Sequence, residues 1–506
     1  MALDYEPLMP HEDDDEDQPD LIPPDDSPEP QDKATESPTK HVREVIISTI
    51  SELLQYARNV PYPSGQLSEE IIVDNGNNSG EATFPHEDAD NGSSPGKENL
   101  SGLAYLEYLW RHKGGVLCNL AATEKYAGFM VENHVLEMIL ANLEVPRSDE
   151  ITEMCLKMLN NLTSQEGINQ SVASTDGLIR AIVEQLFLDD VLCLCEIFWL
   201  LTHSLGGSES FAWVRALRPS RIIRRLVWIM DKASQEILLR RAAGLFLTIL
   251  QCENGIPGIL IPSLIGRGLA ESLTHALKYE TGILYGDSTN SERIRATIDV
   301  TLQAMEALYC LEDHFHKLSF SKEQILVISS LVRYASEIKF REIRIPAVGL
   351  LAKALADDPH HATYLSRDFH FFRGFLNTVV ITRKDREAVQ NVLSHILVHI
   401  NEREMGSTDF LQFVSVLASK TYMIKHVLCH WTDPPSKHHG SSSSESTNAT
   451  IASLRFIISI LKEWTCSNGH GKLSDTGKEC NSIEGDIQRL LRWCERRLQY
   501  MTGNCK

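Results

Sequence analysis

The chain has 506 residues, of which 42% are hydrophobic, and its formal net charge is -21 at pH 7. The apolar content suits a long buried seam, and the excess of acid argues against a nucleic-acid partner, because phosphate backbones bind basic surfaces. No run of 18 apolar residues exists, so no membrane-spanning helix is expected. From Asp4 onward the N-terminus is acidic and lacks a leader pattern, which predicts reduced cysteines and a location in the nucleus or cytoplasm.

Residues 1–40 form an acidic, proline-rich tail. They hold fourteen Asp or Glu against Lys33 and Lys40, together with eight prolines. A segment with few apolar groups and strong self-repulsion cannot offset its ordering entropy, so we expect it to be disordered. The run EDDDED (Glu12–Asp17) is either a solvated stretch of this tail or a segment that docks on a basic surface.

An amphipathic helix is predicted for residues 41–60. Its apolar residues fall on one face at helical spacing: Val42, Val45, Ile46, Ile50, Leu53, Leu54 and Ala57. This face either caps the first unit of the following region or binds another protein. Residues 61–99 are rich in Asn, Gly, Ser and acids, which predicts a flexible linker.

Two serines in these segments are candidate phosphorylation sites. Ser37 lies in SPTK and Ser94 in SPGK, and each places a lysine two residues after the proline. This pattern resembles the consensus of cyclin-dependent kinases, and a phosphate there would change the local charge by almost two units.

A helical motif recurs through residues 100–500. It reads in turn as VLCNLAAT, CLKMLNNLT, LCEIFWLLT and AAGLFLT, and the marks Ala121, Thr163, Thr202 and Thr248 lie 42, 39 and 46 residues apart. Similar helices follow from Thr301, Ile343, Glu387 and Ala449. This period is typical of two- or three-helix repeats, so we predict an all-α armadillo/HEAT-like superhelical solenoid.

Two later steps are longer than this period, at about 61 and 64 residues. Each contains a segment rich in Gly, Ser, Asn or Pro, near residues 279–292 and 432–448. We therefore expect a loop insert at each place.

The repeat region offers no chemistry that we can identify. Phosphate-loop, dinucleotide, zinc-protease and hydrolase motifs are all missing from the sequence. The Cys193 and Cys195 pair has a spacing of two, which points the thiols to different sides of a helix, and the C-terminal Cys and His residues lack a CxxC. We expect no catalytic residue, no metal site and no cofactor.

Arginines cluster in RALRPSRIIRRLVW, which begins at Arg215. The members singled out as partner-binding candidates are Arg218, Arg221, Arg224 and Arg225. They either decorate a solvated helix face or form a site for an acidic peptide, and the tail of the same chain is one such peptide.

The stretch LAYLEYLW, then CLKMLNNLT, WLLTHSL and FAWVRAL, resembles the serum amyloid A-like (Saal) proteins over about residues 100 to 260. The resemblance implies an armadillo-type fold, a nuclear location and a role tied to cell proliferation.

Two asparagines, Asn119 and Asn161, match the ladder that holds extended peptides in importin-α and β-catenin. The following helices carry Trp199 and Phe246 at the matching place, which argues against a nuclear-import receptor. The sequence therefore predicts a non-catalytic scaffold or adaptor that binds a protein along its concave face. A regulatory subunit of a kinase, phosphatase or ubiquitin ligase complex is the alternative.

Overall fold

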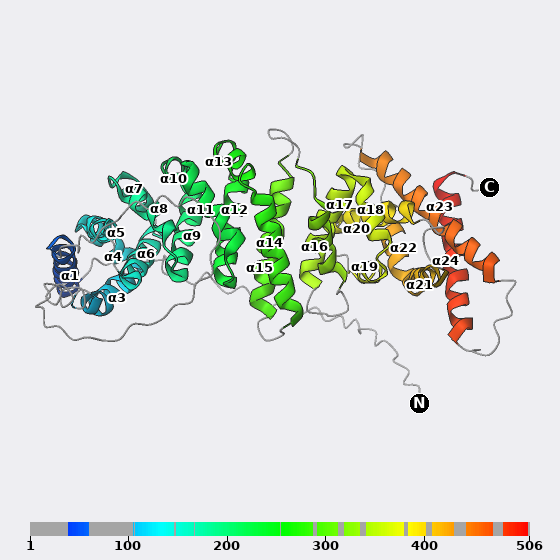
Figure 1. Cartoon of the computed structure of the whole chain (residues 1–506), viewed down its shortest axis with the longest axis horizontal. Coiled ribbons are helices and arrows are strands. Elements are labelled where there is room, and N and C mark those ends of the chain that lie inside the picture. The colour runs from blue at the N-terminus through cyan, green and yellow to red at the C-terminus, as the bar shows by residue number, and fades with distance from the viewer. Residues whose placement is uncertain are drawn as a thin grey trace, which may run out of the picture.

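The computed structural model describes residues 39–59, 105, 107–145, 148–165, 167–252, 255–286, 291–311, 318–333, 341–378, 383–400, 407–429, 442–468 and 479–503. Within these ranges every regular element is a helix, and the helices stack into one elongated array (Figure 1). The chain is thus an all-α armadillo/HEAT-like solenoid, as the repeat period predicts. The predicted tail of residues 1–40, apart from Thr39 and Lys40, and the predicted linker of residues 61–99 lie outside the described residues.

The longest continuous feature is a row that we call the third helices. Its members pack on one another in chain order. They are α3 (Gly115–Ala121), α6 (Asp149–Thr163), α9 (Val191–Leu205), α12 (Glu236–Gln251), α15 (Ser291–Tyr309), α17 (Arg341–Asp357), α20 (Arg383–His399) and α23 (Ser442–Asn468). All eight motifs of the sequence fall on these helices. A helix that packs on both of its neighbours is apolar on both flanks. The apolar residues of these helices therefore form a motif that can be recognised in the sequence.

A second row lies against the first, and we call its members the second helices. They are α5 (Val135–Leu143), α8 (Leu178–Glu184), α11 (Ser220–Lys232), α14 (Leu269–Gly286), α16 (Lys322–Arg333), α19 (Phe369–Phe375) and α21 (Ser407–Ser419). Shorter first helices complete the units at α4 (Glu124–Glu132), α7 (Ile168–Ser174), α10 (Ser210–Leu217) and α13 (Ile256–Ile265). Figure 1 shows α7, α10 and α13 along one edge of the array.

The core runs between these rows as one seam. On α9, for example, Ile197, Phe198 and Leu201 are fully buried, and on α12 so are Leu245 and Phe246. Each buried side chain of this size contributes about 1.5–3 kcal/mol relative to exposure. The seam therefore passes from unit to unit without a break into separate domains.

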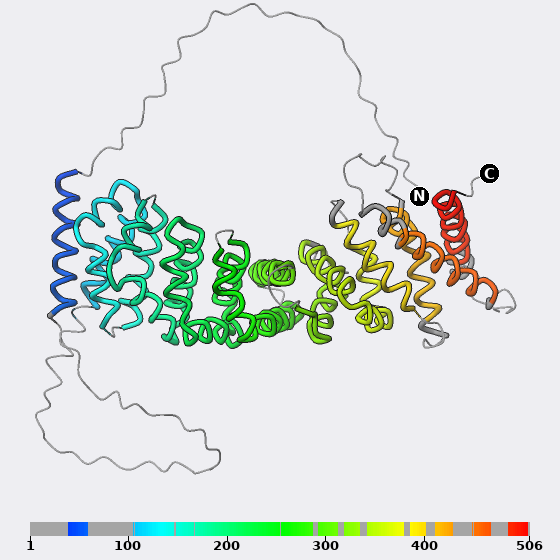
Figure 2. The backbone as a smooth tube through the Cα atoms, turned by 90° about the horizontal axis from the view of Figure 1, so that it is seen from above, coloured from blue at the N-terminus to red at the C-terminus, as the bar shows by residue number. Residues whose placement is uncertain are grey.

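Both ends of the array are closed by amphipathic helices. At the first end α1 (Lys40–Asn59) packs on α5 and buries Ile46, Ile50 and Leu53. At the other end α24 (Glu479–Met501) packs on α23 and α21 and buries Ile487 and Leu490. Figure 2 shows these two helices at opposite extremes of the chain.

The loop insert expected near 279–292 is wrong for most of its length. Residues 279–286 continue α14, and α15 begins at Ser291. Glu280, Thr281 and Leu284 are buried at helical spacing, while Gly282 lies on the exposed side, where it does not interrupt the packing. The long repeat step thus comes from two long helices.

The second insert, expected near 432–448, is only partly described. Residues 442–448 are the first two turns of α23, so this part of the prediction is also wrong. Residues 432–441 lie outside the described residues. Among the helices that are described, none has the length and apolar character needed to cross a bilayer.

Candidate functional site

The outward side of α6, α9, α12 and α15 carries one row of accessible side chains, which we call the third-helix face. The flanks of these helices are buried between neighbours, and most of the residues that remain exposed or half-buried recur at spacings of three or four. They include Glu153, Lys157 and Asn161 on α6; Leu192, Glu196, Trp199 and His203 on α9; Ile237, Arg240 and Arg241 on α12; and Asp299, Gln303 and Glu306 on α15.

The two asparagines of the predicted ladder lie at the start of this face, but they are not equivalent. The Asn161 amide donates a 2.8 Å hydrogen bond to the Cys118 carbonyl of α3, and one turn later Gln165 donates to the Ala122 carbonyl at 3.3 Å. Asn161 thus ties α6 to α3. Asn119 is exposed and has no hydrogen-bond partner among the described residues.

A second asparagine of α6 ties it to the helix on its other side. The Asn160 amide donates to the Glu196 carbonyl at 3.1 Å and to the Glu196 carboxylate at 2.6 Å. The bond to an ionised acceptor is the stronger kind. The neighbouring asparagines of α6 therefore both serve to join repeats.

The most built-up part of the third-helix face is an aromatic stack on α9 and α12. The Arg241 guanidinium lies 3.7 Å from the ring centroid of Trp199, and the ring centroid of His203, one helical turn further along α9, lies 4.2 Å from that of Trp199. Burial, followed by the charge on Arg241, lowers the pKa of His203, so the imidazole is mainly uncharged at neutral pH. Cation and indole together make a rigid, flat surface that can take an apolar or polar side chain.

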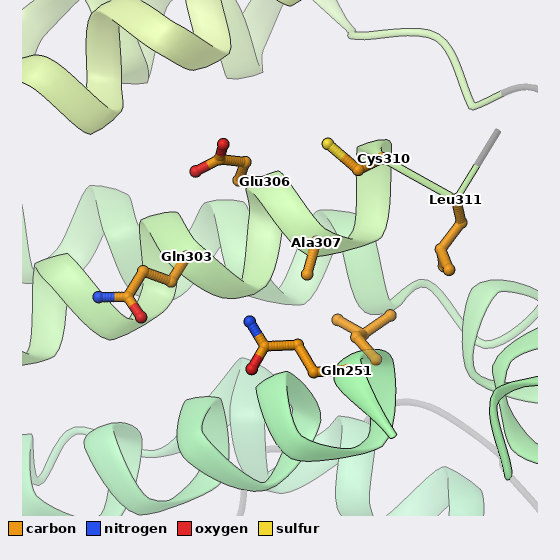
Figure 3. A pocket seen from close by; sticks show the side chains of 7 residues that line it. Gln251, Gln303, Glu306, Ala307, Cys310 and Leu311 are labelled. Atoms are coloured by element: carbon orange, nitrogen blue, oxygen red, sulfur yellow. The ribbon is translucent and has the colours of Figure 1, made fainter. Parts of the chain in front are cut away.

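A pocket opens on the same face between the C-terminal halves of α12 and α15 (Figure 3). Its volume is about 510 Å³, and it is lined by Leu250, Gln251, Gln303, Glu306, Ala307, Cys310 and Leu311. In Figure 3 Gln251 points across the gap toward Gln303 and Ala307, whereas Glu306 and Cys310 point away from Gln251. Two exposed amides above an apolar floor can bind a peptide through both donors and acceptors.

The edge of this pocket continues to α17. The Lys353 ammonium donates to the Cys310 thiol at 3.3 Å, and Cys310 is exposed. The pocket therefore connects three consecutive third helices, α12, α15 and α17.

Two of the predicted arginines on α11 are occupied by internal contacts. Arg221 binds the Glu184 carboxylate through both guanidinium nitrogens, and Arg225 donates to the Leu186 and Leu188 carbonyls at 2.8 and 2.7 Å. Arg225 also pairs with Asp189 at 2.9 Å, and its side chain is only 14% exposed. These two residues join α11 to the preceding repeat.

The other two candidates differ from them. Arg218 and Arg224 are exposed and have no partner among the described residues. Ser37 and Ser94 lie outside the described residues, so their phosphorylation stays a prediction.

Side-chain pairs between consecutive repeats, like that of Arg221 with Glu184, recur along the second helices. Each joins residues about one repeat apart: Arg180 with Glu144, Arg221 with Glu184, His275 with Asp231, Lys278 with Glu323, Arg333 with Asp368, and the Tyr285 hydroxyl with the Ser330 carbonyl. We call this series the second-helix ladder.

Most described cysteines are buried or half-buried free thiols, whereas Cys310 and Cys466 are exposed, which differs from the core packing that the sequence suggests. Burial raises the pKa of Cys118 and Cys195 to about 11 and that of Cys494 to about 12, so all three are protonated at neutral pH. Within the ranges that the structure covers, no three His, Cys, Asp or Glu side chains are grouped to hold a metal ion.

Sequence reasoning missed the Trp199 and Arg241 stack and the pocket. The two stacked residues are 42 residues apart, which equals the first repeat step, so the period itself carried a usable signal. No such signal pairs Gln251 with Gln303, because the step between their helices is lengthened by α14 and α15.

No protein-family model matches the chain, and no curated protein matches it. Several solved structures are similar in shape. An engineered protein is 13% identical, with 90% of this chain and 99% of that chain covered and a TM-score of 0.44. A designed armadillo repeat protein in complex with the peptide (KR)4 is 15% identical, with 60% and 95% covered and a TM-score of 0.29.

A further structure, of computationally designed armadillo repeat proteins for modular peptide recognition, is 15% identical, with 60% and 95% covered and a TM-score of 0.28. At such identities and TM-scores these likenesses carry no argument about the ligand of this chain. Its architecture follows from its own helix order and packing, which are those of an armadillo-like repeat array.

Proposed function

We propose that the chain is a non-catalytic scaffold that binds an extended segment of a protein partner along the third-helix face. The observation that carries the proposal is the unbroken row of third helices with a pocket of about 510 Å³ opening on it between α12 and α15. Solenoids present surfaces of this kind to partners, because stacking leaves one long accessible side on every unit.

The chemistry of the face suits a peptide backbone. Exposed amides at Asn119 and Gln251 offer donors and acceptors, and the Gln303 amide, which donates to Asp299 at 2.8 Å, still offers its oxygen and its second N–H. The Trp199 and Arg241 stack offers a flat contact between them. The face carries both signs of charge, with the cations Lys157, Arg240 and Arg241 and the anions Glu153, Glu196 and Glu306. A partner of mixed charge therefore fits better than a nucleic acid.

The proposal is tested by changing the pocket mouth in the full-length chain. The double variant Gln251→Arg with Gln303→Arg puts two large cations in the pocket and leaves the buried seam untouched, because both side chains are exposed. We expect proximity labelling in cells to lose the proteins that contact the wild-type third-helix face. Circular dichroism should show the same helix content for both chains.

A matched control places the same two substitutions on other helices, as Gln170→Arg on α7 with Gln499→Arg on α24, which are also exposed. This control should keep the wild-type set of labelled proteins. If the wild-type chain and both variants label the same proteins, the third-helix face is not the binding surface.

We also propose the cellular setting that the Saal resemblance implies, namely a nuclear scaffold linked to cell proliferation. The support is the set of motifs between about residues 100 and 260 together with the armadillo-like architecture. Imaging of the tagged endogenous protein should place at least part of it in the nucleus. Exclusion from the nucleus in dividing cells would contradict this setting.

A further inference from the structure

A second surface, on the opposite row of helices, combines exposed aromatic rings with unpaired arginines. On α11 the residues Arg221, Arg224 and Trp228 follow at spacings of three and four and point outward, while Ile222, Ile223, Leu226 and Val227 are buried. We call the surface formed by Phe187, Arg218, Arg221, Arg224 and Trp228 the α11 face.

Internal contacts hold the rings of the α11 face in place. The Arg221 guanidinium lies 5.2 Å from the Phe187 ring centroid, and the Arg225 guanidinium lies 4.5 Å from that of Trp228. Both arginines are themselves fixed by the pairs with Glu184 and Asp189. Phe187 and Trp228 nevertheless stay 42% and 47% exposed. The two rings are thus held in place and accessible beside the arginines of the face.

The unpaired cations set the charge of the ligand. Arg218 and Arg224 are exposed and have no partner among the described residues, so they attract an anion without first breaking an internal bond. A ligand for the whole face needs acidic groups for the arginines and apolar groups for the rings.

The chain itself contains such a segment. Glu12–Asp17 reads EDDDED, and it is flanked by Leu8 and Met9 on one side and by Leu21 and Ile22 on the other. Residues 1–40 carry fourteen acids against two lysines. Acidic and apolar residues therefore stand together in the arrangement that the α11 face requires.

The tail is also long enough. Twenty-one residues, 18–38, separate Asp17 from Thr39 at the start of α1, and they can span up to about 70 Å. From α1 the path to α11 runs over α5 and α8, because α1 packs on α5, α5 packs on α8, and Glu184 at the end of α8 pairs with Arg221. At about 8–10 Å per packed helix this distance is about 30 Å, well within reach.

We propose that the α11 face is the docking site of the acidic segment Glu12–Asp17 of the same chain. The contact covers Arg218 and Arg224 and places the flanking apolar residues against Phe187 and Trp228. It does not involve the third-helix face, so it stands or fails independently of the scaffold function.

The test is arginine footprinting of the purified full-length chain. Phenylglyoxal modifies accessible guanidinium groups, and peptide mass spectrometry gives a rate for each arginine. In the variant with all six acids of Glu12–Asp17 changed to Gln or Asn, we expect Arg218 and Arg224 to react about threefold faster than in wild type at low salt. Arg455 and Arg496, which are exposed and lie far along the chain, should react equally in both.

Salt provides a second readout, because attraction between exposed charges is screened beyond about 8 Å at physiological ionic strength. At high salt the wild-type rates at Arg218 and Arg224 should rise to those of the variant. Equal rates in the two chains at low salt would overturn the proposal.

A matched variant changes six other acids of the same tail, Asp20, Asp25, Asp26, Glu29, Asp32 and Glu36, to Asn or Gln. This variant has the same net charge as the first. It should keep Arg218 and Arg224 protected. Equal deprotection by both variants would show a general effect of charge and would overturn the assignment to Glu12–Asp17.

Discussion

At the scale of single residues, Glu280 of α14 is a buried acid whose surroundings oppose its charge. It is 1% exposed, and neither of its carboxylate oxygens has a hydrogen-bond partner among the described residues. Burial, followed by the charge of Glu236 on α12, raises its pKa to about 7. Glu236 itself accepts a 2.8 Å hydrogen bond from Thr297 and lies 3.6 Å from the Arg240 guanidinium.

A raised pKa in the folded state makes the stability of this region depend on pH. Below the unfolded pKa near 4.5 both states are protonated, and as pH rises toward 7 only the unfolded state ionises, so folding loses free energy over that window. We predict that Glu280→Gln flattens this decline and stabilises the chain at pH 8 by about 1–3 kcal/mol. Thermal unfolding at pH 5 and pH 8 measures the effect.

The control for this prediction is Glu271→Gln, an exposed acid on the same helix. It should leave the pH dependence unchanged. A Glu280→Gln chain whose melting temperature falls with pH as steeply as that of wild type would show that Glu280 is ionised in the folded state.

The adjacent arginines of α11 allow a second prediction at this scale. Arg225→Ala leaves the Leu186 and Leu188 carbonyls without their donor and removes a contact with Trp228, so we expect a loss of about 2 kcal/mol or more. Arg224→Ala should cost much less, because that side chain is exposed and pairs with no described residue. Thermal unfolding of both variants decides the matter, and equal melting temperatures would contradict a structural role for Arg225.

At the scale of elements, the third helices could be predicted from the sequence and most of the others could not. Helices such as α6 and α9 are apolar on two flanks, and this leaves a pattern that recurs along the chain. First helices such as α7 are short and half exposed, so they lack such a pattern. At the end of α14 the residues Gly, Asp and Ser are typical of a loop. The helix nevertheless extends past Gly282, because Leu284 is buried in the core.

The amphipathic helix α1 provides a prediction at this scale. Ile50 is buried against the array and Ile47 is 44% exposed on the same helix, so the same substitution at Ile47 is a matched control for one at Ile50. Ile50→Asp should release α1 by burying a charge and should speed amide exchange over residues 40–59 by more than about tenfold. Ile47→Asp should leave exchange there unchanged.

Exchange over α9 and α12 should be the same in both of these variants, because each repeat contacts only its neighbours. If Ile50→Asp leaves exchange over residues 40–59 at the wild-type rate, α1 is not held by this contact.

At the scale of the whole molecule, the period of the sequence predicts the architecture but not the site. Repetition fixes which helices stack, since each unit must bury its apolar face on the next. Whether an arginine is free or paired depends on side chains one repeat away, as the contrast of Arg224 with Arg225 shows. The sequence could therefore locate the arginine cluster, but it could not distinguish arginines that bind the preceding repeat from those that do not.

Because of the second-helix ladder, the contacts between repeats on the two sides of the array depend differently on ionic strength. On that side, pairs such as Lys278 with Glu323 and Arg221 with Glu184 join the repeats through largely exposed charges, which dissolved ions weaken. The third helices are joined by buried apolar side chains, and moderate salt changes the free energy of these contacts little. We therefore expect the curvature of the array to change with ionic strength, because the contacts of one row weaken while those of the other row do not.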